Sequence, residues 1–161
     1  MIIRLSQKLG KKIGVQPTQT LLLHSNPFAD WSANLFTAEK TQYIILTNTE
    51  SLYSVMTFGR GITNDGKFIE KLTSVLDEFL RDDGFAFIWQ RLISPEITSV
   101  RFSKSLNRSV TGSMNEIVRC AKYLLIIREM SPFDVSRDLN EMPMSMIEHV
   151  CPRDEFRSQI L

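Results

Sequence analysis

Residues 28–58 read FADWSANLFTAEKTQYIILTNTESLYSVMTF, and this stretch decides the fold. Its first part, Trp31–Thr37, alternates apolar and polar side chains with the period of two that is typical of a strand. Gln42–Thr47 is nearly continuously apolar, as in a central strand that is covered on both faces. Leu52–Phe58 gives a third strand, and the short polar turns between the three predict an antiparallel meander.

Helical patterns flank this meander on the chain. In the clearest one, Phe68, Leu72, Leu76 and Leu80 fall on one helix face, after an Asn64–Asp65 cap and before Gly84. Shorter helices are predicted at Ser6–Lys12, Phe85–Ile93, Ile117–Leu125, after Ser131 and after Cys151; further strands are predicted at Met1–Leu5 and, at a sheet edge, at Ile97–Ser103. The sequence therefore predicts an α+β fold: an antiparallel sheet of four or five strands with helices packed mainly on one face.

The length and composition are those of one ordinary globular domain over residues 1–161. The chain is 43% hydrophobic and 23% charged, and its formal net charge is +1. Strong non-specific binding to nucleic acid draws on a surplus of Lys and Arg, so the global charge does not support it. A local basic patch would have to be formed in space. No apolar run approaches the length of a membrane span, and no signal peptide is recognised, which predicts a cytoplasmic protein.

The cysteines and histidines give no sign of a metal site or a cofactor. Cys120 and Cys151 stand alone rather than in the paired spacing that zinc sites favour. We expect a buried free thiol at Cys120 and a reducing compartment. His24 and His149 are interpreted as ordinary surface residues, and the methionines Met142, Met144 and Met146 as core filler.

The densest polar cluster runs from Asn107 to Glu116, with Arg108, Ser109 and Ser113 between them. Ser113 and Glu116 have the spacing of a capping box, which would leave the residues before Ser113 as a loop at a helix N-terminus. Free backbone N–H groups there favour anions, and Arg108 could add a forked contact. In the alternative, Asn107 caps the helix earlier and the cluster is structural.

A second polar cluster lies at the start of the meander. In a strand, Asp30, Ser32 and Asn34 share one face and Trp31 points to the other. This face could line a cleft or meet solvent, and Asp30 could instead pair with a nearby arginine. The candidate ligand-binding residues are therefore Asp30, Asn34, Asn107, Arg108, Ser109, Ser113 and Glu116.

Several functions are compatible with these clusters. The absence of a recognisable catalytic motif favours a non-catalytic binding or regulatory module, whose ligand is a small anion, a nucleotide or a protein. The alternative is a phosphate-ester hydrolase or nuclease that uses Arg108 with Asp30 or Glu116 as base. A second alternative is one component of a toxin–antitoxin pair. A homodimer formed through the edge strand near Ile97–Ser103 is a further hypothesis.

Five blocks of sequence carry a resemblance. They read M-I-I-R-L-S-Q-K-L from Met1, D-W-S-A-N-L from Asp30, I-L-T-N-T-E-S-L-Y-S from Ile45, N-R-S-V-T-G-S-M-N-E from Asn107 and L-N-E-M-P-M from Leu139. Together they resemble a bacterial family of domains of unknown function over nearly the whole chain. The resemblance implies a compact intracellular bacterial protein and points to the same two polar clusters, without assigning an activity.

Overall fold

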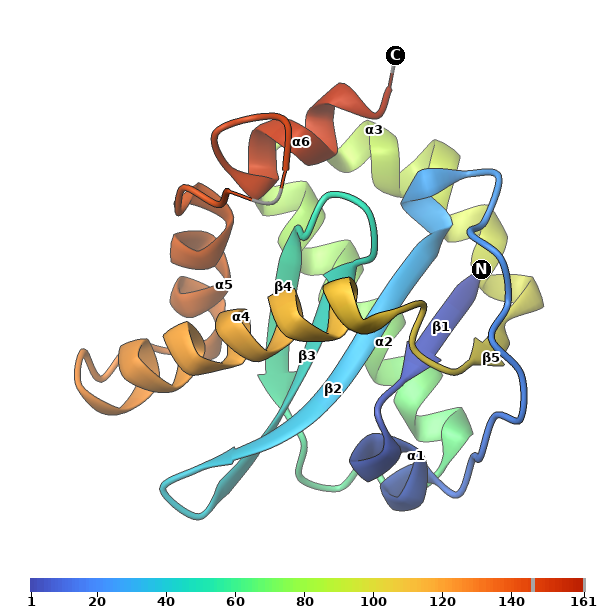
Figure 1. The fold of residues 1–161 in the computed structure, drawn as a ribbon, viewed down its shortest axis with the longest axis horizontal. Coiled ribbons are helices and arrows are strands. Elements are labelled where there is room, and N and C mark those ends of the chain that lie inside the picture. Colours follow the sequence, from blue (N-terminus) through green and yellow to red (C-terminus); the bar gives the residue numbers. More distant parts are fainter. Residues whose placement is uncertain (146, 161) are drawn as a thin grey trace.

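The fold is built on one five-stranded mixed sheet, seen in the computed structural model, which describes residues 1–145 and 147–160 (Figure 1). Its strands are β1 (Ile2–Leu5), β2 (Asp30–Ala38), β3 (Thr41–Asn48), β4 (Ser54–Phe58) and β5 (Arg101–Ser103), in the order β4-β3-β2-β1-β5. The strands β2, β3 and β4 form the predicted antiparallel meander.

The sheet is mixed because β1 pairs in parallel with both β2 and β5. The prediction of a purely antiparallel sheet is therefore corrected. After β1 the chain passes through α1 (Gln7–Ile13) and a long connection before it enters β2 from the same end, so the two strands must run in the same direction. Parallel strands need such a crossover, whereas the meander needs only short turns.

The remaining elements are helical. They are α2 (Asp65–Asp82), α3 (Ala86–Ile88), α4 (Arg108–Ile126), α5 (Pro132–Glu141) and α6 (Pro152–Ser158), with the 3-10 helices η1 (Pro27–Ala29) and η3 (Ser94–Ser99) and the π-helix η2 (Trp89–Ile93). The helical prediction for Phe85–Ile93 is confirmed by α3 and η2. The edge strand predicted at Ile97–Ser103 is confirmed only at its end, because residues up to Ser99 form η3 and Pro95 lies in its first turn.

Helices cover both faces of the sheet, which corrects the prediction that they pack mainly on one face. In Figure 1, α4 crosses in front of the sheet and α2 lies behind it. On the α2 face, the larger hydrophobic cluster joins Trp31, Ala33 and Leu35 of β2 to residues of α1, α2 and α6. On the α4 face, the smaller cluster joins Phe36 and Ala38 of β2 to α4 and α5.

The methionines near the C-terminus have different outcomes. Met142 and Met144 pack against the smaller cluster, as predicted for core filler, whereas Met146 lies outside the described residues. Cys120 is half-buried beside the same cluster rather than buried.

The outer edge of β4 is closed by side chains of α5. Asn140 Oδ1 accepts from the Ser54 N–H at 2.7 Å, and Asn140 Nδ2 donates to the Ser54 carbonyl at 2.8 Å. Ser136 Oγ accepts from the Met56 N–H at 2.9 Å. An amide and a hydroxyl thus replace the strand that would otherwise pair with this edge.

Candidate functional site

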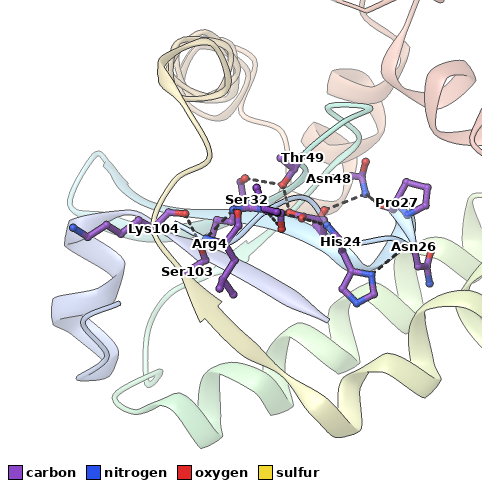
Figure 2. A network of polar contacts seen from close by, with 12 residues as sticks. Arg4, His24, Asn26, Pro27, Ser32, Asn48, Thr49, Ser103 and Lys104 are labelled. Atoms are coloured by element: carbon purple, nitrogen blue, oxygen red, sulfur yellow. Dashed lines mark hydrogen bonds and ion pairs between the residues drawn. The ribbon is translucent and has the colours of Figure 1, made fainter. Parts of the chain in front are cut away.

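The predicted cluster at the start of β2, which contains Asp30, lies in a buried polar network on the α4 face of the sheet (Figure 2). Arg4 of β1 and Asp30 of β2 form an ion pair with two contacts, Nε to Oδ1 and Nη2 to Oδ2, each 2.8 Å. Both side chains are 0% exposed. The register of the parallel strands pairs Ile2 with Asp30 and Arg4 with Ser32, which brings the guanidinium beside the carboxylate.

Every oxygen of Asp30 has further partners. Oδ1 also accepts from Thr49 Oγ1 at 2.8 Å, and Oδ2 accepts from the His24 backbone N–H at 3.0 Å. Thr49 Oγ1 is in turn 2.9 Å from Ser32 Oγ. A carboxylate that is buried and fully hydrogen-bonded in this way is a structural element of the sheet, not a base that substrate could reach.

The same network fastens the segment 19–24, which we call the strap, across the sheet. Arg4 Nη1 donates to the Leu21 carbonyl at 2.7 Å and Nη2 to the Leu22 carbonyl at 3.2 Å. Ser103 Oγ of β5 accepts from the Leu21 N–H at 2.9 Å. Arg4, which sequence reasoning did not single out, therefore organises the predicted cluster around Asp30. The sequence feature that could have identified Arg4 is a single arginine within an otherwise apolar predicted strand.

Glu50 stands at the margin of this network. Partial burial, with the negative charge of Asp30 as a second cause, raises the pKa of the Glu50 carboxyl above its ordinary value. Asn34, the other predicted residue of β2, is half-buried.

The predicted cluster from Asn107 to Glu116 forms the first turns of α4. Asn107 is the N-cap, and its Oδ1 accepts from the Val110 N–H at 3.0 Å, so the structural alternative for the helix start is confirmed. Ser113 lies inside the helix and donates to the Ser109 carbonyl at 3.1 Å. Asn107, Arg108 and Ser109 are exposed at the helix start, whereas Ser113 is buried.

The structure does not bring Arg108 together with either predicted base, Asp30 or Glu116. Glu116 lies about 12 Å further along the α4 axis, at a rise of about 1.5 Å per residue. Its Oε1 accepts from Arg119 Nη1 at 2.7 Å. Asp30 belongs to the buried pair with Arg4. Ligand binding at the predicted set stays a prediction, because the helix start alone does not distinguish a cap from a site.

A different surface gathers charge of one sign. Lys8, Lys11 and Lys12 of α1 and Lys122 of α4 line a hollow of about 710 Å³, which we call the lysine hollow. Its remaining lining comes from Leu35, Phe36 and Thr37 of β2 and from Gln42 of β3, so no carboxylate of the described residues lines it. Lys12 Nζ donates to Gln42 Oε1 at 2.9 Å, which holds one ammonium group at the rim.

The basic surface continues on the other side of α1. A second hollow of about 560 Å³ shares Lys11, includes Lys104 and is otherwise lined by uncharged side chains. Sequence reasoning missed the lysine hollow because Lys122 stands far from the α1 lysines on the chain. A net charge of +1 also conceals a local surplus.

Two other titratable side chains, Tyr53 and His149, have close acidic partners. Tyr53 is buried, and its hydroxyl donates to Asp83 Oδ2 at 2.6 Å; burial, followed by the charge of Asp83, raises the pKa of this phenol. His149 Nδ1 lies 2.8 Å from Glu155 Oε2 at an exposed position. Within residues 1–145 and 147–160, no three His, Cys, Asp or Glu side chains could hold a metal ion. Among the described helices, none is both long and apolar enough to cross a membrane.

Comparison with known proteins is consistent with the resemblance noted in the sequence. No curated protein matches the chain. Residues 2–155 match the family described as Domain of unknown function (DUF6933), and this range contains both polar clusters, the strap and the lysine hollow. A match over nearly the whole length shows the family, and the chain belongs to the DUF6933 family.

Proposed function

We propose that this protein is a non-catalytic binding module that holds an anionic ligand in the lysine hollow. The observation that carries the proposal is the convergence of four lysines from α1 and α4 on one hollow, which no carboxylate from residues 1–145 or 147–160 lines. Like charges that are held together repel one another, and an anion relieves this repulsion when it binds.

The position of the hollow supports a binding role. Lys8, Lys11 and Lys122 are exposed, so their ammonium groups can reach a ligand without a change of fold. The hollow lies beside β2, which is held on its other side by β3. A floor formed by a strand, with exposed cationic side chains around it, suits a ligand that is recognised mainly by its charge.

The hydrolase alternative receives less support from the same geometry. It needs Arg108 and an available carboxylate at one site, whereas Asp30 is buried with Arg4 and Glu116 is paired with Arg119. The toxin–antitoxin alternative stays a prediction, and growth arrest on expression of the protein alone would support it. A bacterial, cytoplasmic origin belongs to the same set of proposals, since the free cysteines suit a reducing compartment.

The test compares two matched double variants by fluorescence anisotropy with labelled polyglutamate. Lys8→Gln/Lys11→Gln removes two charges from the lysine hollow, and Lys67→Gln/Lys71→Gln removes two from α2. We expect the first variant to bind about tenfold more weakly, since each lost ion pair at an exposed site contributes up to about 1 kcal/mol. Equal binding by both variants, or no binding by the wild type, would contradict the proposal.

A further inference from the structure

The edge of β2 is open where the lysine hollow lies. β1 pairs with β2 only as far as Leu5 and Ala33, and β2 continues to Ala38. The floor of the hollow is formed by Leu35, Phe36 and Thr37, which belong to this continuation. A stretch of strand edge about 13 Å long therefore lies beyond the end of its partner, at about 3.3 Å per residue.

The direction in which the backbone N–H and C=O groups of β2 point follows from their hydrogen bonds to the neighbouring segments. The Ala33 carbonyl points toward β1, because it accepts from the Ser6 N–H at 3.0 Å. The Asp30 carbonyl points toward β3, because it accepts from the Thr49 N–H at 3.0 Å. Since direction alternates along a strand, the N–H and C=O groups of Leu35 and Thr37 point with those of Ala33, away from β3.

Open and closed edges can be compared within this one sheet. At β4, the groups of Ser54 and Met56 are satisfied by Asn140 and Ser136 of α5. At Leu35 and Thr37, the part of the chain that the structure describes supplies no comparable side-chain partner. Strand edges without partners are sites where an extended chain can pair.

The lysines around the hollow determine which charge an extended chain bound there can carry. α1 belongs to the hydrophobic cluster on one face of the sheet and α4 to the cluster on the other, so the lysines flank the open edge from both sides. Lysines often protect an edge strand from pairing with another copy, but those lysines stand on the strand itself. Here they stand on neighbouring helices, where they repel basic chains and attract acidic ones.

We infer that the lysine hollow binds an acidic peptide in an extended conformation, which pairs as an added strand with β2 at Leu35 and Thr37. The inference rests on the proposed function and names the kind of ligand. A single-stranded nucleic acid fits the hollow less well, because it needs aromatic rings on which bases stack. The aromatic residue in the lining, Phe36, is 6% exposed.

The test uses three labelled probes and fluorescence anisotropy. They are a short peptide in which glutamate and threonine alternate, the same peptide methylated on its central backbone nitrogens, and a short oligothymidine. Methylation keeps the charge and removes the N–H donors. We expect the methylated peptide to bind about tenfold more weakly, because it loses hydrogen bonds of about 1 kcal/mol each.

A second readout locates the peptide. Amide hydrogen exchange at Leu35 and Thr37 should slow when the unmodified peptide binds, whereas exchange at Phe36, whose N–H points toward β3, should stay unchanged. Thr37→Pro removes one outward N–H and should weaken the peptide but not the oligothymidine; circular dichroism checks that this variant folds.

Each remaining outcome decides between the two proposals. Equal binding of both peptides without slowed exchange would overturn strand addition and leave anion binding standing. Tighter binding of oligothymidine than of the peptide would also overturn strand addition, in favour of nucleic acid. If exchange at Leu35 and Thr37 slows at high protein concentration without any acidic probe, a second copy of the chain occupies this edge. That result would overturn the acidic-peptide inference. Failure of all three probes to bind would overturn both proposals.

Discussion

Arg4 and Asp30 lie on neighbouring parallel strands and form a buried ion pair whose two contacts are both 2.8 Å. The remaining donors of Arg4 hold the strap, and the remaining acceptors of Asp30 hold Thr49 and His24. One pair of side chains thus joins β1, β2, the strap and the turn after β3.

Replacing Arg4 should destabilise the fold strongly. Arg4→Leu leaves Asp30 buried without its counter-ion, and the free energy of unfolding should fall by about 3–5 kcal/mol in urea denaturation. Arg101→Leu on β5, where the side chain is exposed, is the control and should change stability by less than about 0.5 kcal/mol. The double variant Arg4→Leu/Asp30→Leu should recover part of the loss. A loss for Arg4→Leu as small as that of the control would contradict the structural role.

Removing the amide that closes β4 should also be costly. Asn140→Ala leaves the N–H and C=O of Ser54 without partners in a buried position, and we expect a loss of about 2–4 kcal/mol. Asn115→Ala removes an exposed amide on α4 and should have little effect. The comparison is made by thermal unfolding. If both variants unfold at the same temperature, the β4 edge does not depend on Asn140.

Tyr53 should make stability fall in alkaline solution. Burial and the Asp83 carboxylate raise the pKa of Tyr53 above its ordinary 10.0, so the unfolded chain loses this proton at a lower pH than the folded one. The neutral phenol contributes fully to the free energy of unfolding below about pH 10, and this contribution is lost as the pH rises further.

The variant Tyr53→Phe separates this contribution from other alkaline effects. At neutral pH it should be less stable by about 1 kcal/mol, because the hydrogen bond to Asp83 is missing. Above about pH 10 its stability should fall less steeply than that of the wild type, by up to about 1.4 kcal/mol per pH unit. Urea denaturation at a series of pH values measures both differences between Tyr53→Phe and the wild type. If the free energies of unfolding of the two proteins fall in parallel above about pH 10, the raised pKa of Tyr53 is contradicted.

The two residues at the start of α4 should behave differently from each other. Asn107→Ala removes the cap and should lower stability by about 1 kcal/mol, whereas Arg108→Ala, at an exposed position, should not. Thermal unfolding of both variants with phosphate, sulfate and nucleotides tests the predicted anion site. If an anion stabilises the wild type but not Arg108→Ala, the cluster binds anions as well as capping the helix.

The parts of the fold that were predictable depend on short-range patterns. The meander follows from the alternation in β2 and the apolar run in β3, and α2 follows from one apolar face between two caps. The parallel position of β1 did not follow, because a strand of three apolar residues and Arg4 fits either direction. Pairing of strands distant on the chain is decided by where the connection between them packs, which local periodicity does not contain.

The site was predictable only in part for the same reason. The Asp30 cluster and the Asn107 cap were recognisable as polar stretches, but the partner of Asp30 stands 26 positions earlier on the chain. Lys8 and Lys122 likewise meet only after α1 and α4 have packed on opposite faces of one strand. The net charge is a sum over the whole chain and cannot show that particular lysines lie close together.

The place of β1 between β2 and β5 has a kinetic consequence. Arg4 and Ser103, which are hydrogen-bonded in the finished sheet, stand 99 positions apart on the chain. A contact across so long a loop forms slowly, because the loop's entropy is lost before the contact contributes. The meander and α2 can form early from near neighbours. The arrival of β5 then completes the sheet and fastens the strap, so loss of the segment 101–103 would leave β1 with one bare edge and Arg4 short of a partner.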